Sequence, residues 1–396
     1  MSINIRELTD ASAVLQAIAE HDAMGRKAFH DRYDDGEADH LYLQHEDRLY
    51  GARAIAGAAY DFQPPPATTS RIDSSGGQGD AHTTLRALGY TVLSGRPTTI
   101  DDERNWRQAM WKHLIACSNP EGLVTSAEVR SVGAYGSQQG IWVDKARTKH
   151  LHPKGLGVGL KHTGTDYPDE INDESALYHY PITERRGQDE AEVEATKTAA
   201  ELKLPVFMIS ERGSLRSVKL AWIAGWEDRS KRFLVTFGPE APARLLTTDR
   251  SDETPFELEG NRRRRRTGTV TTRPDQARFK LEVFHRYGPV CPLSGIAVTE
   301  MLEAAHLRPV AANGTSDPRN GLPLNAALHR AFDAHLFAIH PVTREVLVRP
   351  QGPNLAQLGI TKTHLDGLAN YPHPDALAWR YEKWREKNKL TSPTAA

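Results

Sequence analysis

The chain has 396 residues, with 50 basic and 51 acidic side chains and a formal net charge of −1. At roughly 150 residues per domain, this length leaves room for two or three domains. With only Cys117 and Cys291, the chain can build neither a disulfide framework nor a four-cysteine zinc site. It shows no signal-peptide pattern and no apolar run long enough to cross a bilayer. We therefore expect a soluble, cytoplasmic protein without a membrane partner.

Residues 1–118 have the apolar spacing of helices, as at Leu15 and Ile18. The phrase LYGARAIAGAAY at 49–60 predicts another helix, which a run of prolines closes, and HTTLRALGY predicts a third that ends at Gly89. We predict an α-rich head domain over residues 1–118, and the residues assign it no catalytic role.

In residues 119–240 the spacing of the apolar residues changes from the helical pattern of the first segment. Short runs rich in β-branched and aromatic residues, such as IWVD, GVGLKH, LPVFMIS and RFLVTFG, are bounded by Gly, Pro or Asp/Asn clusters and predict strands. The segment Asp189–Leu202 has a helical pattern instead. We predict a β-barrel or sandwich with an attached helix, within a chain whose overall class is multidomain α+β.

Residues 241–275 are polar and predict a linker before the last domain, residues 276–396. A run of like charges is typical of a solvated segment, but placed here it could also neutralise DNA phosphates without reading sequence. The candidate phosphate contacts are the five consecutive arginines Arg262, Arg263, Arg264, Arg265 and Arg266.

The last domain carries the most specific motif. Cys291–Gly295 predicts a strand and turn, Glu303–Val310 a second strand and Leu324–Phe337 a helix, which is the order ββα. The phrases AAHLRPV, DPRNGLPL and LNAALHRAFD within residues 278–345 resemble the HNH, or ββα-metal, nuclease family.

Phosphodiester hydrolysis needs a base that activates water and a cation that stabilises the phosphate. His306 is the candidate general base, because a neutral imidazole takes up a proton near physiological pH. By resemblance to the family, Asn320 would brace the loop that carries His306. His329 would bind the metal, and Asp333 is one helical turn further on the same face.

The sequence departs from one common form of the family at Ala305, where many members have a further metal ligand. Water, phosphate oxygens or Glu303 could complete the coordination shell, and the spacing does not choose among them.

The phrases GIWVD, GVGLKHTGTDYPDEIN, ALYHYPIT and QDEAEVEAT, within residues 125–238, resemble the SRA fold in the form found in McrA-type enzymes. That resemblance implies base flipping, with a modified cytosine held in a pocket. Tyr167, Asp169 and Tyr180 are the candidate pocket residues. For both tyrosines, base stacking and core packing remain open, and Glu170 or Asp173 could replace Asp169 as the carboxylate that faces the base.

The phrase LYGARAIAGAAYDFQPPP, with SSGGQGDAHTTLRALGYTV after it, resembles the head module of the same enzymes. The whole chain thus resembles McrA-type modification-dependent restriction endonucleases of the ScoMcrA-like and TagI-like kind. This resemblance implies cleavage of double-stranded DNA containing 5-methylcytosine or a related base, with Mg²⁺, Mn²⁺ or another divalent transition metal as cofactor. No P-loop motif is present, so we expect no requirement for a nucleoside triphosphate.

We expect a homodimer, because one HNH site cuts one strand. Two alternatives remain open at this point. One is a noncatalytic protein that binds modified DNA and keeps a relic HNH fold, and the other is an HNH nuclease or nickase for unmodified DNA.

Overall fold

A computed structural model of the chain describes residues 5–33, 40–64, 78–137, 140–162, 170–183, 185, 187–260 and 276–390. The chain divides into two compact units. Unit 1 contains Met1–Thr163 and Pro181–Ala221, and unit 2 contains Gly164–Tyr180 and Trp222–Ala396. Among the described residues, no helix combines the length and the apolar character that a membrane span requires.

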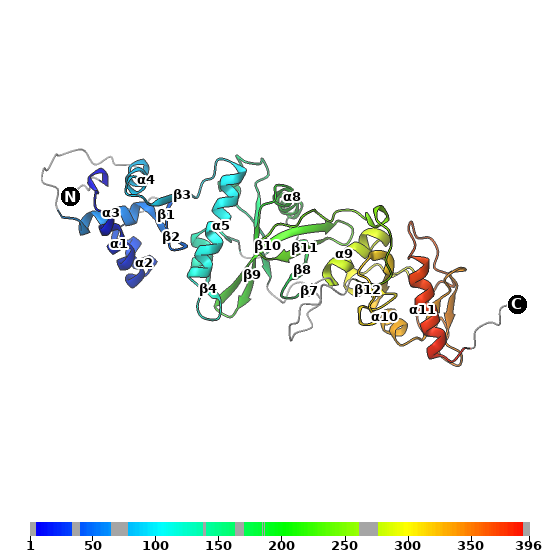
Figure 1. Cartoon of the computed structure of the whole chain (residues 1–396). Coiled ribbons are helices and arrows are strands. Elements are labelled where there is room, and N and C mark those ends of the chain that lie inside the picture. Colours follow the sequence, from blue (N-terminus) through cyan, green and yellow to red (C-terminus); the bar gives the residue numbers. More distant parts are fainter. Residues whose placement is uncertain are drawn as a thin grey trace. The chain divides into compact units, whose positions relative to one another are not determined.

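The N-terminal part of unit 1 packs helices around a small antiparallel sheet of order β2-β1-β3 (Figure 1). Helix α3 is rich in alanine and almost wholly buried, which allows α1 to pack closely against it. The helices are α1 (Ala11–Met24), α2 (Arg26–Tyr33), α3 (Ala52–Phe62) and α4 (Gln78–Ala87), after the short 3₁₀ turn Ile5–Glu7. The strands are β1 (Leu41–His45), β2 (Arg48–Gly51) and β3 (Thr91–Ser94).

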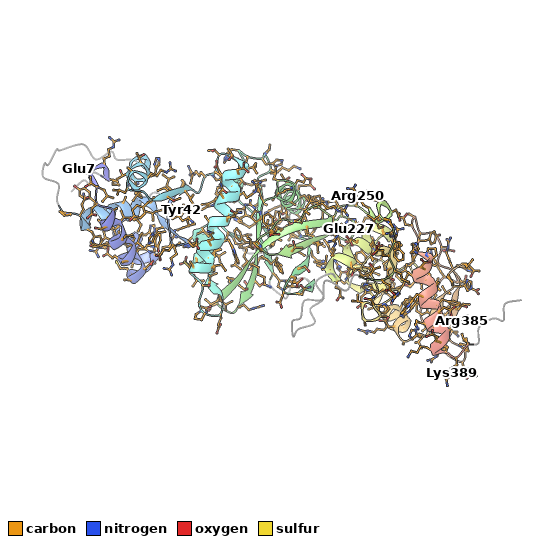
Figure 2. All side chains as sticks on the ribbon, in the orientation of Figure 1. Glu7, Tyr42, Glu227, Arg250, Arg385 and Lys389 are labelled. Atoms are coloured by element: carbon orange, nitrogen blue, oxygen red, sulfur yellow. The ribbon has the colours of Figure 1, made fainter. Side chains whose placement is uncertain are left out.

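The helix predicted at 49–60 therefore begins three residues later, at Ala52, because the residues before it form strand β2. Helix α5 (Ile100–Ala116) follows the small sheet and begins with a capping box between Thr99 and Asp102. Tyr42 of β1, which is labelled in Figure 2, packs against Trp106 of α5. The ring centroids of the two residues are 4.8 Å apart. This contact joins the N-terminal part of unit 1 to the elements that come next.

The rest of unit 1 places α5 and α8 (Gln188–Glu201) with a sheet of order β5-β6-β9-β10. Helix α8 confirms the attached helix predicted within the strand-rich region. The remaining elements are β4 (Leu123–Thr125), α6 (Ser126–Ser131), β5 (Ile141–Val143), α7 (Lys145–Thr148), β6 (Gly157–His162) and β9 (Val206–Arg212).

Strand β10 (Leu215–Glu227) contributes to both units, since the boundary falls after Ala221. In unit 2 the sheet continues in the order β10-β11-β8-β7. These strands are β11 (Arg232–Phe237), β8 (Ser175–His179) and β7 (Glu170–Ile171).

The predicted closed barrel is wrong. The described strands form a mixed sheet, in which β6 pairs parallel to β9 and the two outer strands, β5 and β7, each pair with one neighbour. Within the described residues these outer strands are three and two residues long, and such short strands offer few backbone groups for the pairing that closure requires. The sequence pattern identified the strands but carried no information on whether the outer two would meet.

The C-terminal part of unit 2 is built on α9 (Gln276–Tyr287) and a hairpin of β12 (Leu302–His306) and β13 (Gly321–Asn325). Helix α10 (Ala326–Asp333) follows β13 directly, and buried residues of α9, the hairpin and α10 form one core. The other elements are β14 (Phe337–Ile339), β15 (Val346–Val348), α11 (Pro374–Lys387) and the 3₁₀ turns Ser251–Glu253, Thr299–Met301, Val310–Ala312 and Pro318–Asn320.

The ββα order is present, but one strand was predicted in the wrong place. Cys291–Gly295 forms a turn, and the partner of β12 is the later segment GLPLN. This strand was not predicted from the sequence because it contains Pro323, and proline is disfavoured inside sheets. Proline is tolerated here because each strand of a two-stranded sheet is an edge strand. The predicted helix also stops early, at Asp333, because His335 has a left-handed φ of 56° and the chain then enters β14.

A buried ion pair links α5 to the sheet of unit 1. The side chains of Glu103 and Arg107 are fully buried and meet at 2.6 Å. Arg107 also donates to the carbonyls of Gly157 and Pro205, at 2.8 and 2.7 Å. Burial raises the pKa of Glu103, but the guanidinium groups of Arg107 and Arg147 outweigh it, and the net pKa is lowered. Glu103 is therefore ionised at neutral pH.

We predict that Arg107→Met lowers the free energy of unfolding of unit 1 by about 3–5 kcal/mol, because Glu103 keeps a buried charge with one partner fewer. Chemical denaturation followed by far-UV circular dichroism measures the change. The control is Lys112→Met, which removes an exposed pair with Asp47 and should cost less than about 1 kcal/mol. Equal costs for the two variants would contradict a structural role for the buried pair.

Candidate active site

The hairpin places His306 at the end of β12, opposite Gly321 at the start of β13. The residues between them form a loop that starts and ends at this pair. At the other end of β13, the Oδ1 atom of Asn325 caps α10 by accepting from the backbone N–H of Leu328 at 3.0 Å, and its Nδ2 donates to Ser294 at 2.9 Å. The strand and the helix are thereby fixed to each other.

Asn320 ties the loop together from inside. Its side chain is completely buried. Its Oδ1 atom accepts from the N–H of Arg308 at 2.9 Å, and its Nδ2 atom donates to the carbonyls of Arg308 and Thr315 at 2.9 and 2.7 Å. The carbonyl of Asn320 also accepts from Leu307, the residue that follows His306. The backbone immediately after His306 is therefore fixed by one residue, through both its side chain and its carbonyl group.

His329 of α10 lies between two carboxylates. Its Nδ1 atom is 2.6 Å from Oε2 of Glu303, and its Nε2 atom is 3.5 Å from Oδ2 of Asp333, one helical turn on. Arg380 of α11 donates to Oδ1 of Asp333 at 3.3 Å and so orients that carboxylate. The structure thus brings His329, Asp333 and Glu303 together, and Glu303 is one of the groups that the sequence left open.

The two contacts of His329 differ in length, and the difference separates their roles. If the shorter contact, at 2.6 Å, is a charge-assisted hydrogen bond from Nδ1–H to Glu303, the neutral ring has its Nε2 lone pair on the side of Asp333. Two ligand atoms that are each about 2.0–2.2 Å from one ion lie about 3.0–3.5 Å apart. The separation of Nε2 and Oδ2 fits this requirement. His329 and Asp333 can therefore hold a divalent cation, with Glu303 fixing the tautomer of the histidine.

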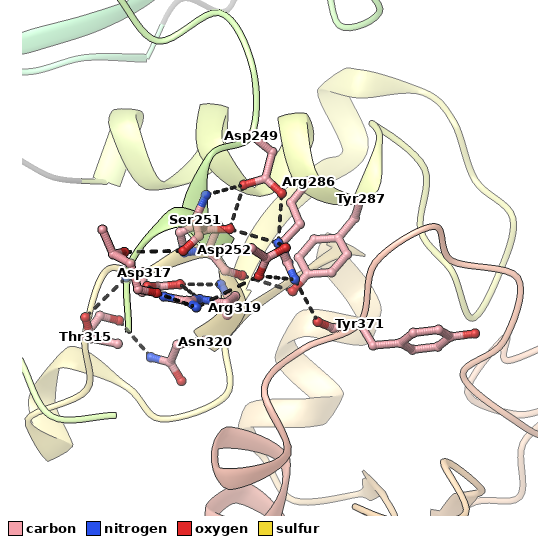
Figure 3. Close-up of polar contacts among 12 residues, drawn as sticks. Asp249, Ser251, Asp252, Arg286, Tyr287, Thr315, Asp317, Arg319, Asn320 and Tyr371 are labelled. Atoms are coloured by element: carbon pink, nitrogen blue, oxygen red, sulfur yellow. Dashed lines mark hydrogen bonds and ion pairs between the residues drawn. The ribbon is translucent and has the colours of Figure 1, made fainter. Parts of the chain in front are cut away.

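The segment that precedes the arginine run in the sequence packs against the loop. We call residues 249–260 the docked segment. Arg286 of α9 binds its first part, donating to Asp249 and Ser251 at 2.8 Å and to Asp252 at 3.1 Å (Figure 3). The guanidinium therefore joins the docked segment to the helix that underlies the hairpin.

Arg319 binds the middle of the docked segment. It donates to the carbonyl of Thr254 at 3.0 Å and to the carboxylate of Asp317 at 2.7 and 3.0 Å (Figure 3). The end of the segment pairs with the loop through Gly260 N–H to Asn313 O and Thr315 N–H to Leu258 O, at 2.9 and 3.2 Å. Residues 249–260 belong to the predicted linker in sequence, but they make specific contacts with the nuclease loop.

The candidate base-reading residues are placed only in part. Tyr167 and Asp169 lie outside the described residues. Tyr180 is 7% exposed; its hydroxyl donates to Asp228 at 2.9 Å, and its ring packs against Phe233. These are features of a core tyrosine, which was one of the two hypotheses for this residue.

The candidate phosphate contacts Arg262, Arg263, Arg264, Arg265 and Arg266 also lie outside the described residues.

In unit 1, His113, Cys117 and Glu128 lie close enough together to suggest a metal site. Their bonding does not fit one. The Nδ1 atom of His113 accepts from the N–H of Leu49 at 2.9 Å, so in the neutral ring Nε2 carries the proton and faces Glu128 at 3.5 Å. Burial raises the pKa of Cys117 to about 11, which disfavours the thiolate that a metal needs.

Two protein families match the chain. Residues 6–94 match the ScoMcrA-like N-terminal head domain, and residues 291–340 match the HNH endonuclease family. The C-terminal part of the chain is an HNH endonuclease domain. The predicted resemblance to McrA-type enzymes is confirmed for the head and for the nuclease.

Two solved structures are similar to the chain. A structure titled "Modification dependent TagI restriction endonuclease" has 17% sequence identity and a TM-score of 0.28, over 68% of this chain and 94% of that one. The type IV phosphorothioation-dependent restriction endonuclease ScoMcrA has 14% identity and a TM-score of 0.24, over 97% of this chain and 100% of that one. No curated protein sequence matches the chain.

We predict that Asn320→Ala destabilises unit 2 by about 2–4 kcal/mol, because it leaves three partly buried backbone groups without their partner. DNA cleavage should fall at least tenfold even at temperatures where the variant is folded, since the loop that carries His306 loses its internal tie. Thermal unfolding and cleavage assays measure the two effects. The control is Asn354→Ala in an exposed turn, with an expected cost below about 1 kcal/mol. Full activity of folded Asn320→Ala would show that the loop does not need this tie.

We predict that Glu303→Ala weakens metal binding by about 10–100-fold, because the carboxylate orients His329 rather than binding the ion. Asp333→Ala should weaken it further. Mn²⁺ binding by isothermal titration calorimetry, with DNA cleavage measured over the same concentrations, separates the variants. If excess Mn²⁺ restores DNA cleavage by Asp333→Ala but not by Glu303→Ala, the roles of ligand and orienting group that we assign to these two carboxylates are reversed.

Proposed function

We propose that this chain is a modification-dependent restriction endonuclease that hydrolyses DNA phosphodiesters at the HNH site. The observation that carries the proposal is the group of His329, Asp333 and Glu303 beside the braced His306 loop, within residues that match an HNH endonuclease. A head domain of the ScoMcrA-like family at the N-terminus supports an enzyme of the restriction type.

In this proposal His306 is the general base that takes a proton from the attacking water. Asn320 keeps the backbone after His306 in place, and His329 and Asp333 hold the metal, which is Mg²⁺, Mn²⁺ or another divalent ion. When bound there, the cation would stabilise the charge on the phosphate and on the leaving oxygen. Glu303 keeps the Nε2 lone pair of His329 available by accepting the proton of Nδ1.

In the proposed domain order, an α-rich head (1–118) is followed by the strand-rich part (119–240), the linker (241–275) and the nuclease (276–396). The strand-rich part is proposed to flip and read a modified cytosine, such as 5-methylcytosine. Tyr167, Asp169 and Tyr180 are its proposed pocket residues. If Tyr180 contacts the base, its bond to Asp228 and its packing on Phe233 must change when DNA binds. The arginines from Arg262 to Arg266 are proposed to neutralise phosphates, and a homodimer would supply one nuclease site per strand.

Of the two similar structures, one is described only as modification-dependent and the other as phosphorothioation-dependent. The modification is therefore best treated as the variable of the experiment. Four copies of one plasmid serve as substrates: one unmodified, one containing 5-methylcytosine, one containing 5-hydroxymethylcytosine and one phosphorothioated.

We predict that, with Mg²⁺ or Mn²⁺ and without ATP, the wild-type chain cuts a modified plasmid at least tenfold faster than the unmodified one. His306→Ala should lose at least 100-fold in rate, because the water then has no base. The control is His364→Ala, an exposed histidine of the same unit, which should keep wild-type activity. Gel electrophoresis measures both cutting and binding.

Each of the other outcomes selects another function. Equal cutting of all four plasmids would contradict the proposed recognition of a modified base and would indicate an HNH nuclease for unmodified DNA. Binding of modified DNA without cutting, under every metal condition, would leave a noncatalytic reader with a relic HNH fold.

A further inference from the structure

The ring of His306 lies flat on a phenylalanine of α9. The ring centroids of His306 and Phe279 are 3.8 Å apart, and the rings are inclined by only 12°. Phe279 is 1% exposed and belongs to the core that joins α9 to the hairpin. The orientation of a histidine ring depends on two side-chain torsions, and flat stacking on Phe279 restricts both of them.

Gly321 makes room for Phe279. Gly321 is the cross-strand partner of His306, and a Cβ atom there would lie 2.6 Å from Cζ of Phe279 and 2.8 Å from Cγ2 of Val283. The φ of Gly321 is −138°, which any residue can adopt. Glycine is therefore required at this position by the close approach of α9 and not by the backbone conformation.

We propose that Phe279 is a positioning residue for His306 in DNA cleavage, and that Gly321 is glycine in order to admit it. The inference rests on the proposed role of His306 as general base. Phe279 acts through His306 in two ways. It holds the imidazole in one plane, which matters because small displacements of a reacting group cost large factors in rate. Its ring face also stabilises the positive charge that His306 gains as it takes up a proton.

The matched control lies on the same helix. Phe284 is also 1% exposed and packs in the same core, but its ring is not the one that stacks on His306. Phe279→Leu and Phe284→Leu remove the same atoms from the same helix. A purely structural role for Phe279 would make the two variants alike in every measurement.

The experiment measures the single-turnover cleavage rate and the dissociation constant for plasmid DNA, with Mn²⁺, below the unfolding temperature of each full-length variant. We expect Phe279→Leu to lower the rate about 10–100-fold with the dissociation constant changed less than about threefold. Phe284→Leu should keep the rate within about threefold. Phe279→Met, which removes less volume, gives the same comparison if the leucine variant does not fold. Equal rates for the position-279 and position-284 variants would overturn the proposal.

A second pair of variants separates positioning from stability. Gly321→Ala creates clashes with Phe279 and Val283, and Phe279→Leu in the same chain relieves the first of them. We expect the double variant to recover part of the unfolding temperature that Gly321→Ala loses but to stay as slow as Phe279→Leu. Recovery of the cleavage rate together with stability would overturn the proposal.

His306→Ala, run in parallel, distinguishes this failure from failure of the proposed function. If His306→Ala cuts at the wild-type rate, His306 is not the base and the inference falls with it. If His306→Ala is inactive while Phe279→Leu behaves like Phe284→Leu, the function stands and only the role of Phe279 is lost.

Discussion

The carboxamide of Asn320 bonds to both backbone groups of Arg308 and to the carbonyl of Thr315, within a fully buried site. No other uncharged side chain offers an acceptor and two donors in so short a length, which is why the middle of the motif is an asparagine. Since the loop returns to β13 at Gly321, this one amide fixes where β12 ends and where β13 begins. The placement of His306, and the register that brings Glu303 toward α10, both depend on it.

Around this centre, the nuclease loop is supported from two sides by groups of different kinds. Helix α9 supplies the apolar surface of Phe279 on one side. The docked segment supplies backbone pairing and the Arg319 contact on the other. Apolar packing covers one face of the histidine ring, while the hydrogen bonds give the loop a single conformation. If His306 is the general base that we propose, its alignment with a phosphate depends on both.

Several parts of this arrangement could be predicted from the sequence. The spacing of His329 and Asp333 places them one turn apart on a helix, and the structure has them facing each other. Helix α8 and the runs of β-branched residues were predictable for the same reason, because local periodicity encodes them. The match to HNH endonucleases confirms the family predicted from the C-terminal motif.

Other parts depend on contacts between distant residues. Nothing local indicates that Phe279 reaches His306, that Arg319 reaches Thr254 or that β13 follows the loop despite Pro323. Closure of the sheet was predicted wrongly, because alternation along a strand says nothing about its neighbours. Glu303 shows most directly what the sequence could not predict. The spacing did not indicate where its side chain points, whereas the structure places its carboxylate against His329.

Strand β8 has a consequence for how the chain is made. Its partner β11 is synthesised roughly 50 residues later, after α8, β9 and β10, which takes about 3–10 s at ordinary rates of translation. During that interval residues 175–179, all of them buried in the finished protein, can pair only with the two-residue strand β7 and lack β11 on their other side. The ribosome must therefore release most of unit 1 before the first strands of unit 2 can fold. A chain interrupted within that interval would expose an unpaired apolar edge to aggregation and proteolysis.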